Sequence, residues 1–161
     1  MLKVASYDIV FQEVPGEVSL ALNLSGCPCH CPGCHSPHLA EDIGEELNEE
    51  LVADLMEKYG KQITCVCFMG GDHLPQEVAY WADFVKNYQS SILHSPLRMA
   101  WYSGRTNMPS IDGPFDFVKI GPYIEELGAL KSEKTNQRFY ERVEGEWIDS
   151  TYKFRKKNFL D

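Results

Sequence analysis

The sequence predicts one α/β domain over residues 1–161, built on a mostly parallel β-sheet. Segments with the two-residue periodicity of a strand alternate with segments of helical periodicity, in the order β-α-β-α-β-β. One expected strand is apolar almost throughout, which is typical of a strand covered on both faces in a parallel sheet. The length of 161 residues suits a single domain, and a hydrophobic content of 43% is enough to form its core.

The N-terminal part predicts a strand or hairpin, then a core strand and a helix. Val4–Val14 forms the first of these, with a turn at Pro15-Gly16. In Val18–Leu24, aliphatic residues alternate with smaller or polar ones, which predicts the first core strand. Apolar residues then recur every four positions among acidic neighbours, so residues 45–59 are predicted to form an amphipathic helix capped by Gly60.

The next elements complete the order. Ile63–Met69 is the nearly continuous apolar segment and predicts a buried strand. Pro75 stands where a first helical turn would begin, and an apolar stripe continues through residue 88, so a second helix is expected there. Leu97–Ser103 and Phe115–Ile120 predict two further strands, and a weakly patterned tail follows.

Each core strand is followed by an unusual segment. Parallel strands joined by helices place their carboxyl ends at one edge of the sheet, where α/β folds carry their chemistry. We therefore expect four segments to converge at that edge: Gly26–Cys34, Gly70–Asp72, Tyr102–Arg105 and Lys119–Tyr123.

The net charge and the cysteine content limit the classes of function that the sequence allows. With 15 Lys and Arg against 24 Asp and Glu, the net charge is -9, which argues against a general nucleic-acid binder. The sequence shows neither a signal-peptide pattern nor an apolar run long enough for a membrane span, so we predict a cytoplasmic protein. In that compartment six cysteines indicate metal binding or chemistry rather than a disulfide framework.

Four of the cysteines fall within eight residues. Cys27, Cys31 and Cys34 have the spacing C-x3-C-x2-C, which can wrap three thiolates around three corners of a 4Fe-4S cluster and leave one iron open. Cys29 is then a non-ligand inside the loop. The alternative is a structural zinc site, for which this segment offers further soft ligands: Cys29, His30, His35 and His38.

The cysteine loop resembles that of radical S-adenosylmethionine enzymes, and specifically of the anaerobic ribonucleoside-triphosphate reductase activating proteins. Gly70-Gly71-Asp72 is similar to the glycine-glycine-acid segment of that family, and the residues around Ser103, Arg105 and Lys119 resemble its third and fourth strand ends. Thr135–Arg138 looks like its late polar motif. His73 departs from the family, in which proline is frequent at this place.

The resemblance implies a truncated, TIM-like β/α barrel that forms a single radical S-adenosylmethionine domain. Cys27, Cys31 and Cys34 would hold the 4Fe-4S cluster. S-adenosyl-L-methionine would bind along Gly70, Gly71 and Asp72, with the Asp72 carboxylate at its amino end. The remaining cofactor-binding residues would be Ser103, Arg105 and Lys119.

The activity that the resemblance implies is reductive cleavage of S-adenosylmethionine and generation of a glycyl radical on the anaerobic (class III) ribonucleotide reductase. The implied partners are the large subunit of that reductase and a small electron-donor protein, with neither nucleic acid nor a membrane. Two alternatives stay open: a radical enzyme that acts on another glycyl-radical protein or a small molecule, and a non-catalytic zinc-binding interaction module. Outside the loop, Cys65 and Cys67 are interpreted as small core residues.

Overall fold

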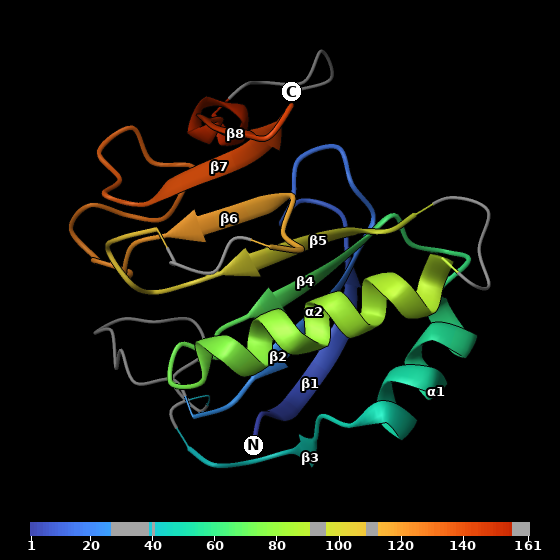
Figure 1. The fold of residues 1–161 in the computed structure, drawn as a ribbon. Helices are drawn as coiled ribbons and strands as arrows, with labels where there is room; N and C mark the ends of the chain where they lie inside the picture. Colours follow the sequence, from blue (N-terminus) through green and yellow to red (C-terminus); the bar gives the residue numbers. More distant parts are fainter. Residues whose placement is uncertain (27–38, 40, 91–95, 109–112, 156–161) are drawn as a thin grey trace.

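The computed structural model describes residues 1–26, 39, 41–90, 96–108 and 113–155, and in these residues eight strands form one open sheet. The strand order is β3-β1-β2-β4-β5-β6-β7-β8 (Figure 1). Four strands form the centre of the sheet and pair in parallel: β2 (Ser19–Leu24), β4 (Cys65–Met69), β5 (Arg98–Tyr102) and β6 (Phe117–Ile120). These are the core strands predicted from the sequence.

The two sides of the sheet are antiparallel. On one side β1 (Lys3–Val10) pairs with β2 and with the two-residue β3 (Glu45–Glu46). On the other side β6 pairs with β7 (Arg138–Val143), which pairs with β8 (Glu146–Asp149). The expectation of a mostly parallel sheet is therefore wrong outside the centre. The connections that lead into β2, β7 and β8 contain no described helix, and antiparallel strands can be joined without a crossover helix. In the described residues the sheet does not close into a barrel.

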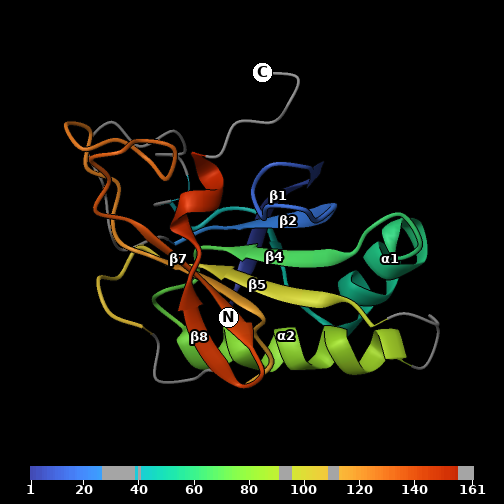
Figure 2. The same cartoon turned by 90° about the horizontal axis from the view of Figure 1, so that it is seen from above.

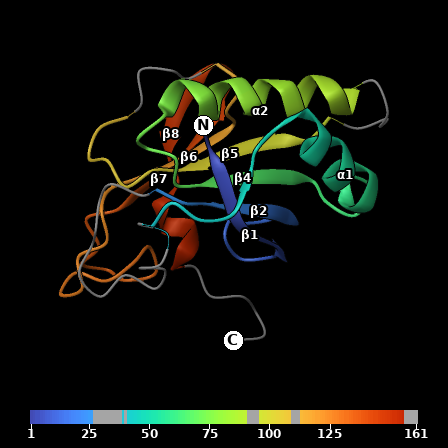
Figure 3. The ribbon, with the colours of Figure 1, turned by 90° about the horizontal axis from the view of Figure 1, so that it is seen from below.

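Both helices lie on the same face of the sheet, as Figures 2 and 3 show from opposite sides. The first helix, α1 (Glu49–Tyr59), begins four residues later than predicted because Glu45 and Glu46 pair with β1. Asn48 caps it by accepting a hydrogen bond from the backbone N–H of Leu51 at 2.8 Å. Gly60 follows with φ -53°, so it continues in the right-handed region and does not form the left-handed cap typical of glycine. The second helix, α2 (Pro75–Ser90), begins at the predicted proline. Neither described helix has the length and apolar character needed to span a bilayer.

The central strands are buried on both faces, and alternate residues feed two cores. Leu22, Phe68, Trp101 and Val118 are register partners across the sheet and pack under the helices. The row beside them faces the opposite side, where a second core forms from Val14, Cys65, Cys67, Ala100, Tyr102, Phe117, Leu130 and Phe139. The central strands are therefore packed on both faces of the sheet, and this packing fixes the positions of their ends.

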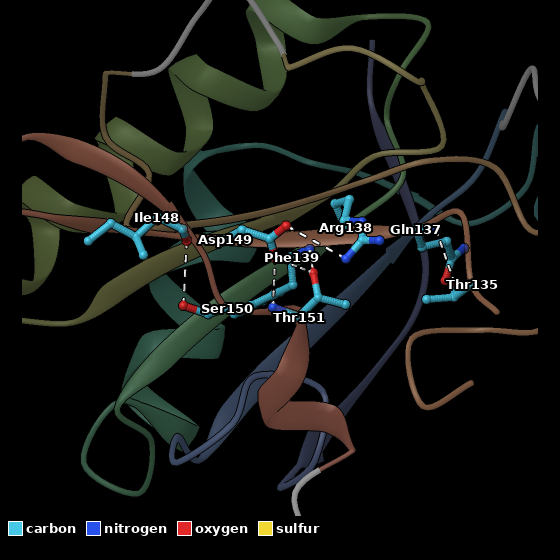
Figure 4. Close-up of polar contacts among 8 residues, drawn as sticks. All are labelled: Thr135, Gln137, Arg138, Phe139, Ile148, Asp149, Ser150 and Thr151. Atoms are coloured by element: carbon cyan, nitrogen blue, oxygen red, sulfur yellow. Dashed lines mark hydrogen bonds and ion pairs between the residues drawn. The ribbon is translucent and has the colours of Figure 1, made fainter. Parts of the chain in front are cut away.

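The weakly patterned tail folds into β7, β8 and a short 3-10 helix, η2 (Thr151–Phe154). Figure 4 shows the side chains that hold this hairpin to the helix: Asp149 accepts hydrogen bonds from the hydroxyl and the backbone N–H of Thr151 and forms an ion pair with Arg138. The Thr151 hydroxyl oxygen in turn accepts from the backbone N–H of Phe139 at 2.9 Å. Phe154 packs against Phe139, so the tail helps to cover the second core.

Candidate functional site

The segments that follow the four central strands contact one another at the carboxyl edge of the sheet, as the topology predicts. Asp72, after β4, accepts hydrogen bonds from the Ser103 hydroxyl and the Gly104 N–H, which follow β5. The loops after β5 and β6 are joined by a backbone hydrogen bond from Gly121 to Arg105 at 2.6 Å. The segment after β2 reaches the same edge, because the Gly26 backbone lies against the ring of His73.

Asp72 is the centre of this network. Asp72 is only 1% exposed. Each of its carboxylate oxygens accepts a hydrogen bond. Oδ1 lies 2.5 Å from Ser103 Oγ, and Oδ2 lies 2.9 Å from the Gly104 nitrogen. The Ser103 hydroxyl oxygen also accepts from the Arg105 N–H at 3.1 Å. In this conformation the carboxylate joins the turn after β4 to the turn after β5.

The two glycines before Asp72 are also fixed by contacts with β5 and α2. Gly70 donates its N–H to the Tyr102 carbonyl at 2.9 Å, and its own carbonyl accepts from the Trp101 indole at 2.7 Å. Gly71 has φ +81°, and a methyl group added to it would lie 2.6 Å from Val78 Cγ2. Glycine is required here by conformation and by space. The turn therefore sits directly against the first turns of α2.

Two cations border the same edge. The guanidinium of Arg105 donates to the Asp72 backbone carbonyl at 2.6 Å, and the residue is exposed. Lys119 Nζ donates to the carbonyls of Ser103 and Gly121 at 2.9 and 3.2 Å. The structure thus brings together all six residues that the sequence assigns to cofactor binding: Gly70, Gly71, Asp72, Ser103, Arg105 and Lys119.

The candidate ligand cysteines, Cys27, Cys31 and Cys34, lie outside the described residues, as do Cys29 and the histidines between 30 and 38. The ends of their segment are described. Gly26 donates its N–H to the Glu41 carbonyl at 3.0 Å, so the chain leaves the end of β2 and returns to it at one point. The preceding residue, Ser25, donates its N–H to the Lys3 carbonyl at 3.0 Å. The two ends of the cysteine segment are therefore fixed close to each other, and Gly26 lies beside the turn that contains Gly70–Asp72.

A comparison with protein families matches residues 14–114 to the 4Fe-4S single cluster domain family. The match includes all four cysteines of the loop and extends through the turns after β4 and β5. The chain belongs to this family. Comparisons with curated proteins and with solved structures find no match. As a member of the 4Fe-4S single cluster family, the chain is an iron-sulfur protein, and this favours iron over zinc at the cysteine loop.

The cysteine side chains of this chain are suitable ligands for a cluster of the kind that the family binds. Cysteine thiolates are the usual ligands of 4Fe-4S clusters. Cys65 and Cys67 do not compete for this role, because both are fully buried free thiols. Burial raises the pKa of the Cys65 thiol to about 12 and raises that of Cys67 well above its usual range. Within the described part of the chain, no group of His, Cys, Asp and Glu side chains could hold a metal ion.

The late polar motif also reaches this edge. Gln137 is buried and donates its side-chain amide N–H to the Gly121 carbonyl at 3.3 Å, while Asn136 donates to the Pro122 carbonyl at 3.0 Å. Thr135 positions the segment by accepting the Gln137 backbone N–H at 3.0 Å (Figure 4). These side chains hold the loop after β6.

Two residues at the edge received no role from the sequence. Trp101 was expected only as part of a strand, yet its indole fixes the Gly70 carbonyl. His73 was noted only as a departure from a family pattern, yet it lies beside the base of the cysteine loop. Its position directly after Asp72 was the available signal. A residue next to a strand-end turn is carried to the same edge as the turn itself.

Proposed function

We propose that this protein is a radical S-adenosylmethionine activating enzyme that generates a glycyl radical on the anaerobic (class III) ribonucleotide reductase. The observation that carries the proposal is the placement of the cysteine loop base and the Gly70-Gly71-Asp72 turn side by side at one sheet edge. The C-x3-C-x2-C spacing supports it, since three ligands leave one iron available for S-adenosylmethionine.

In this proposal Cys27, Cys31 and Cys34 hold the cluster. A bound cluster would supply the one electron, received from a small electron-donor protein, that is needed to break the sulfonium–C5′ bond of S-adenosylmethionine; the products would be methionine and a 5′-deoxyadenosyl radical. That radical takes a hydrogen atom from a glycine of the reductase, which leaves 5′-deoxyadenosine and the glycyl radical.

The edge residues would bind and orient S-adenosylmethionine. Arg105 is exposed, and a guanidinium with five N–H donors can bond a carboxylate while it keeps its contact with the Asp72 carbonyl. Asp72 was assigned to the amino end. Its oxygens already accept from Ser103 and Gly104, so an ammonium group would have to displace one of these donors or share an oxygen with it. The positioning role of Asp72 is independent of that contact.

The open sheet supports a protein substrate. In a truncated barrel the side of the sheet that is not closed by further strands leaves room for a loop of another protein, whereas an enzyme for small molecules needs to surround its substrate. The described sheet ends at β8 without returning to β3. A glycine presented on a reductase loop is the kind of substrate that fits this proposal.

The ligand set is tested by single substitutions after anaerobic reconstitution. Cys27→Ala, Cys31→Ala and Cys34→Ala should each abolish the visible absorption of the 4Fe-4S cluster, because each thiolate holds one iron. Cys29→Ala is the matched control and should keep most of it. If Cys29→Ala loses the cluster like the other three, the ligand assignment is wrong; if the wild-type protein takes up zinc and neither iron nor sulfide, the interaction-module alternative replaces the proposal.

The reaction is tested by mixing the reduced protein, S-adenosylmethionine and the reductase from the same source under strict anaerobiosis. Electron paramagnetic resonance should show a glycyl-radical doublet on the reductase, with stoichiometric 5′-deoxyadenosine. The doublet should vanish when the acceptor glycine is replaced by alanine. If 5′-deoxyadenosine forms but the reductase stays free of radical while a control activating enzyme charges it, the substrate is another protein or a small molecule.

A further inference from the structure

The outer edge of β8 is the open end of the sheet on the side away from α1. In the residues that the structure describes, no strand lies beyond it (Figure 1). Successive residues of a strand direct their backbone groups alternately to its two sides. The N–H of Ser150 donates to the Phe139 carbonyl at 2.8 Å, so Ser150 and every second residue before it face β7. Trp147 and Asp149 therefore direct their backbone N–H and C=O groups outward.

These outward backbone groups have no protein partner within the described part of the chain. The strand that carries them is nevertheless held in place from β7. The Arg142 guanidinium lies 4.6 Å from the centroid of the Trp147 ring, and the Asp149 carboxylate forms an ion pair with Arg138. A fixed strand with unpaired backbone groups can accept one further strand, because an extended segment presents donors and acceptors at the same spacing.

The side chains of β8 indicate what kind of segment fits. Glu146 and Ile148 are two residues apart, so they project from the same face of the sheet, where Val143 is the register partner of Glu146. Ile148 and Val143 are nearly half exposed. The exposed Glu146 carboxylate forms no ion pair with any described residue. An added strand would gain contacts from an apolar side chain beside Ile148 and from a lysine or arginine beside Glu146.

The charge of this strand favours a different protein over a second copy of the chain. Every ionisable side chain from 144 to 149 is acidic: Glu144, Glu146 and Asp149. Two copies paired through β8 would bring these carboxylates together, whereas a basic segment would complement them. The edge therefore fits a partner with the opposite charge.

The strand also reaches close to the functional edge of the sheet. Tyr140 is the register partner of both Val118 and Asp149, so Asp149 is level with Val118. The strand β6 ends two residues later, at Ile120. At about 3.3 Å per residue, β8 therefore ends about 7 Å short of the level of the carboxyl edge. A segment paired with β8 can continue to the level of the site turns.

We propose that the outer edge of β8 binds an extended segment of the large subunit of the reductase by strand addition, with an apolar side chain beside Ile148 and a lysine or arginine beside Glu146. The inference rests on the proposed function, because it takes the reductase as the partner. It names the surface that holds the partner while a glycine is presented at the carboxyl edge. It requires no contact with the residues proposed to bind S-adenosylmethionine.

The first test measures how tightly the reconstituted protein binds the reductase large subunit from the same source, by isothermal titration calorimetry. Glu146→Lys should weaken binding about tenfold, because it sets like charges against each other. Ile148→Ser should weaken binding about fivefold through the lost apolar contact. Asp8→Lys is the matched control and should bind like the wild type, since it makes the same change of charge at an exposed carboxylate on β1, on the opposite side of the sheet. Urea unfolding checks that each variant is folded.

The second test locates the contact by hydrogen exchange, read for single residues by mass spectrometry. In the free protein the amides of Trp147 and Asp149 should exchange rapidly and that of Ser150 slowly, because only Ser150 donates to β7. In the complex with the reductase, exchange at Trp147 and Asp149 should slow by about tenfold or more.

Rapid exchange at Trp147 and Asp149 that persists in the complex overturns the inference, and so does slow exchange there in the free protein. Equal affinities of the wild type, Glu146→Lys and Ile148→Ser overturn it as well. An equal loss in Asp8→Lys would show a general effect of charge and has the same consequence. In each of these cases a glycyl radical formed by the wild type leaves the proposed function intact. A wild-type protein that neither binds nor charges the reductase overturns the proposed function, and the inference falls with it.

Discussion

Asp72→Ala should destabilise the protein even when neither a cluster nor S-adenosylmethionine is present. The substitution removes the acceptor of two hydrogen bonds and leaves the Ser103 hydroxyl and the Gly104 N–H without it. Ser103 is fully buried, so water cannot readily replace the carboxylate there. The turns after β4 and β5 lose the two hydrogen bonds that the carboxylate makes between them.

The magnitude follows from the two orphaned donors. The buried Ser103 hydroxyl costs about 1–3 kcal/mol when it is left unpaired, and the partly buried Gly104 N–H adds less, so the total is about 2–4 kcal/mol. At about 2–4 °C per kcal/mol for a chain of this length, the melting temperature should fall by about 4–16 °C. Asp54→Ala, at an exposed aspartate of α1, is the matched control and should change stability by less than about 0.5 kcal/mol.

The assay is urea unfolding of the apoprotein, followed by circular dichroism. A double-mutant cycle with Ser103→Ala isolates the Asp72–Ser103 contact, and we expect a coupling energy of about 1–3 kcal/mol. If Asp72→Ala unfolds within about 0.5 kcal/mol of the wild type, the carboxylate does not brace the edge. The same variant then tests binding of S-adenosylmethionine cleanly, because folding and binding are measured separately.

Three further outcomes are expected. Gly71→Ala should lose about 2–4 kcal/mol, since its methyl group would lie 2.6 Å from a Val78 methyl at φ +81°; Gly113→Ala, which meets no atom within 4 Å, should be nearly neutral, and equal urea midpoints would contradict this. Cys65, with a pKa near 12, should resist iodoacetamide at pH 8 in the native protein and react after unfolding, as peptide mass spectrometry would show; rapid native labelling would exclude the buried thiol. Desolvation raises the pKa of Asp149, but hydrogen bonds from Thr151 outweigh it and hold that pKa below its ordinary value of 3.8. The resulting stability is present above about pH 4 and is lost as the pH falls further, so Asp149→Asn should flatten the pH dependence of the urea midpoint between pH 4 and 2; parallel curves would refute the assignment.

The centre of the fold could be predicted because its residues obey strong patterns. In β2 the apolar alternation reports one buried face, and in β4 a continuous apolar run reports two. The helix that begins at Pro75 carries an apolar stripe, and the core under the helices includes its residues Val78 and Val85. In these elements packing and local preference favour the same structure.

The antiparallel sides could not be predicted in the same way. In β7 only Phe139 is fully buried, and Val143 is 46% exposed, so β7 lacks a clear apolar face. In β8 Ile148 is 47% exposed. The hairpin depends on a turn in which Glu144 and Gly145 both have positive φ, and on the Thr151 hydroxyl, which bonds both Asp149 and the backbone of Phe139, twelve residues away. A sequence pattern does not record which partner completes such bonds.

Topology predicted where the site residues meet, but not how each one is used. Backbone groups lose their ladder partners where strands end, and at this edge side chains replace them: Trp101 bonds the Gly70 carbonyl, Arg105 the Asp72 carbonyl and Asp72 the Gly104 N–H. Polar residues at strand ends therefore serve the fold as well as a ligand, and the sequence pattern is the same for both.

What separates the two uses is the hydrogen-bonding capacity that remains after folding. Asp72 is buried and both of its carboxylate oxygens already accept a bond, so its first effect is on the position of the neighbouring turns. Arg105 donates one of its five guanidinium N–H groups to the Asp72 carbonyl, and the residue is exposed. It can therefore bond an anionic group without breaking a hydrogen bond that stabilises the fold. A polar residue at this edge can contact a ligand directly only if it has hydrogen-bond donors or acceptors that the backbone groups at the strand ends do not already use. By that measure we expect Arg105, rather than the Asp72 carboxylate, to contact the proposed S-adenosylmethionine, while the Asp72 backbone carbonyl holds the guanidinium in place.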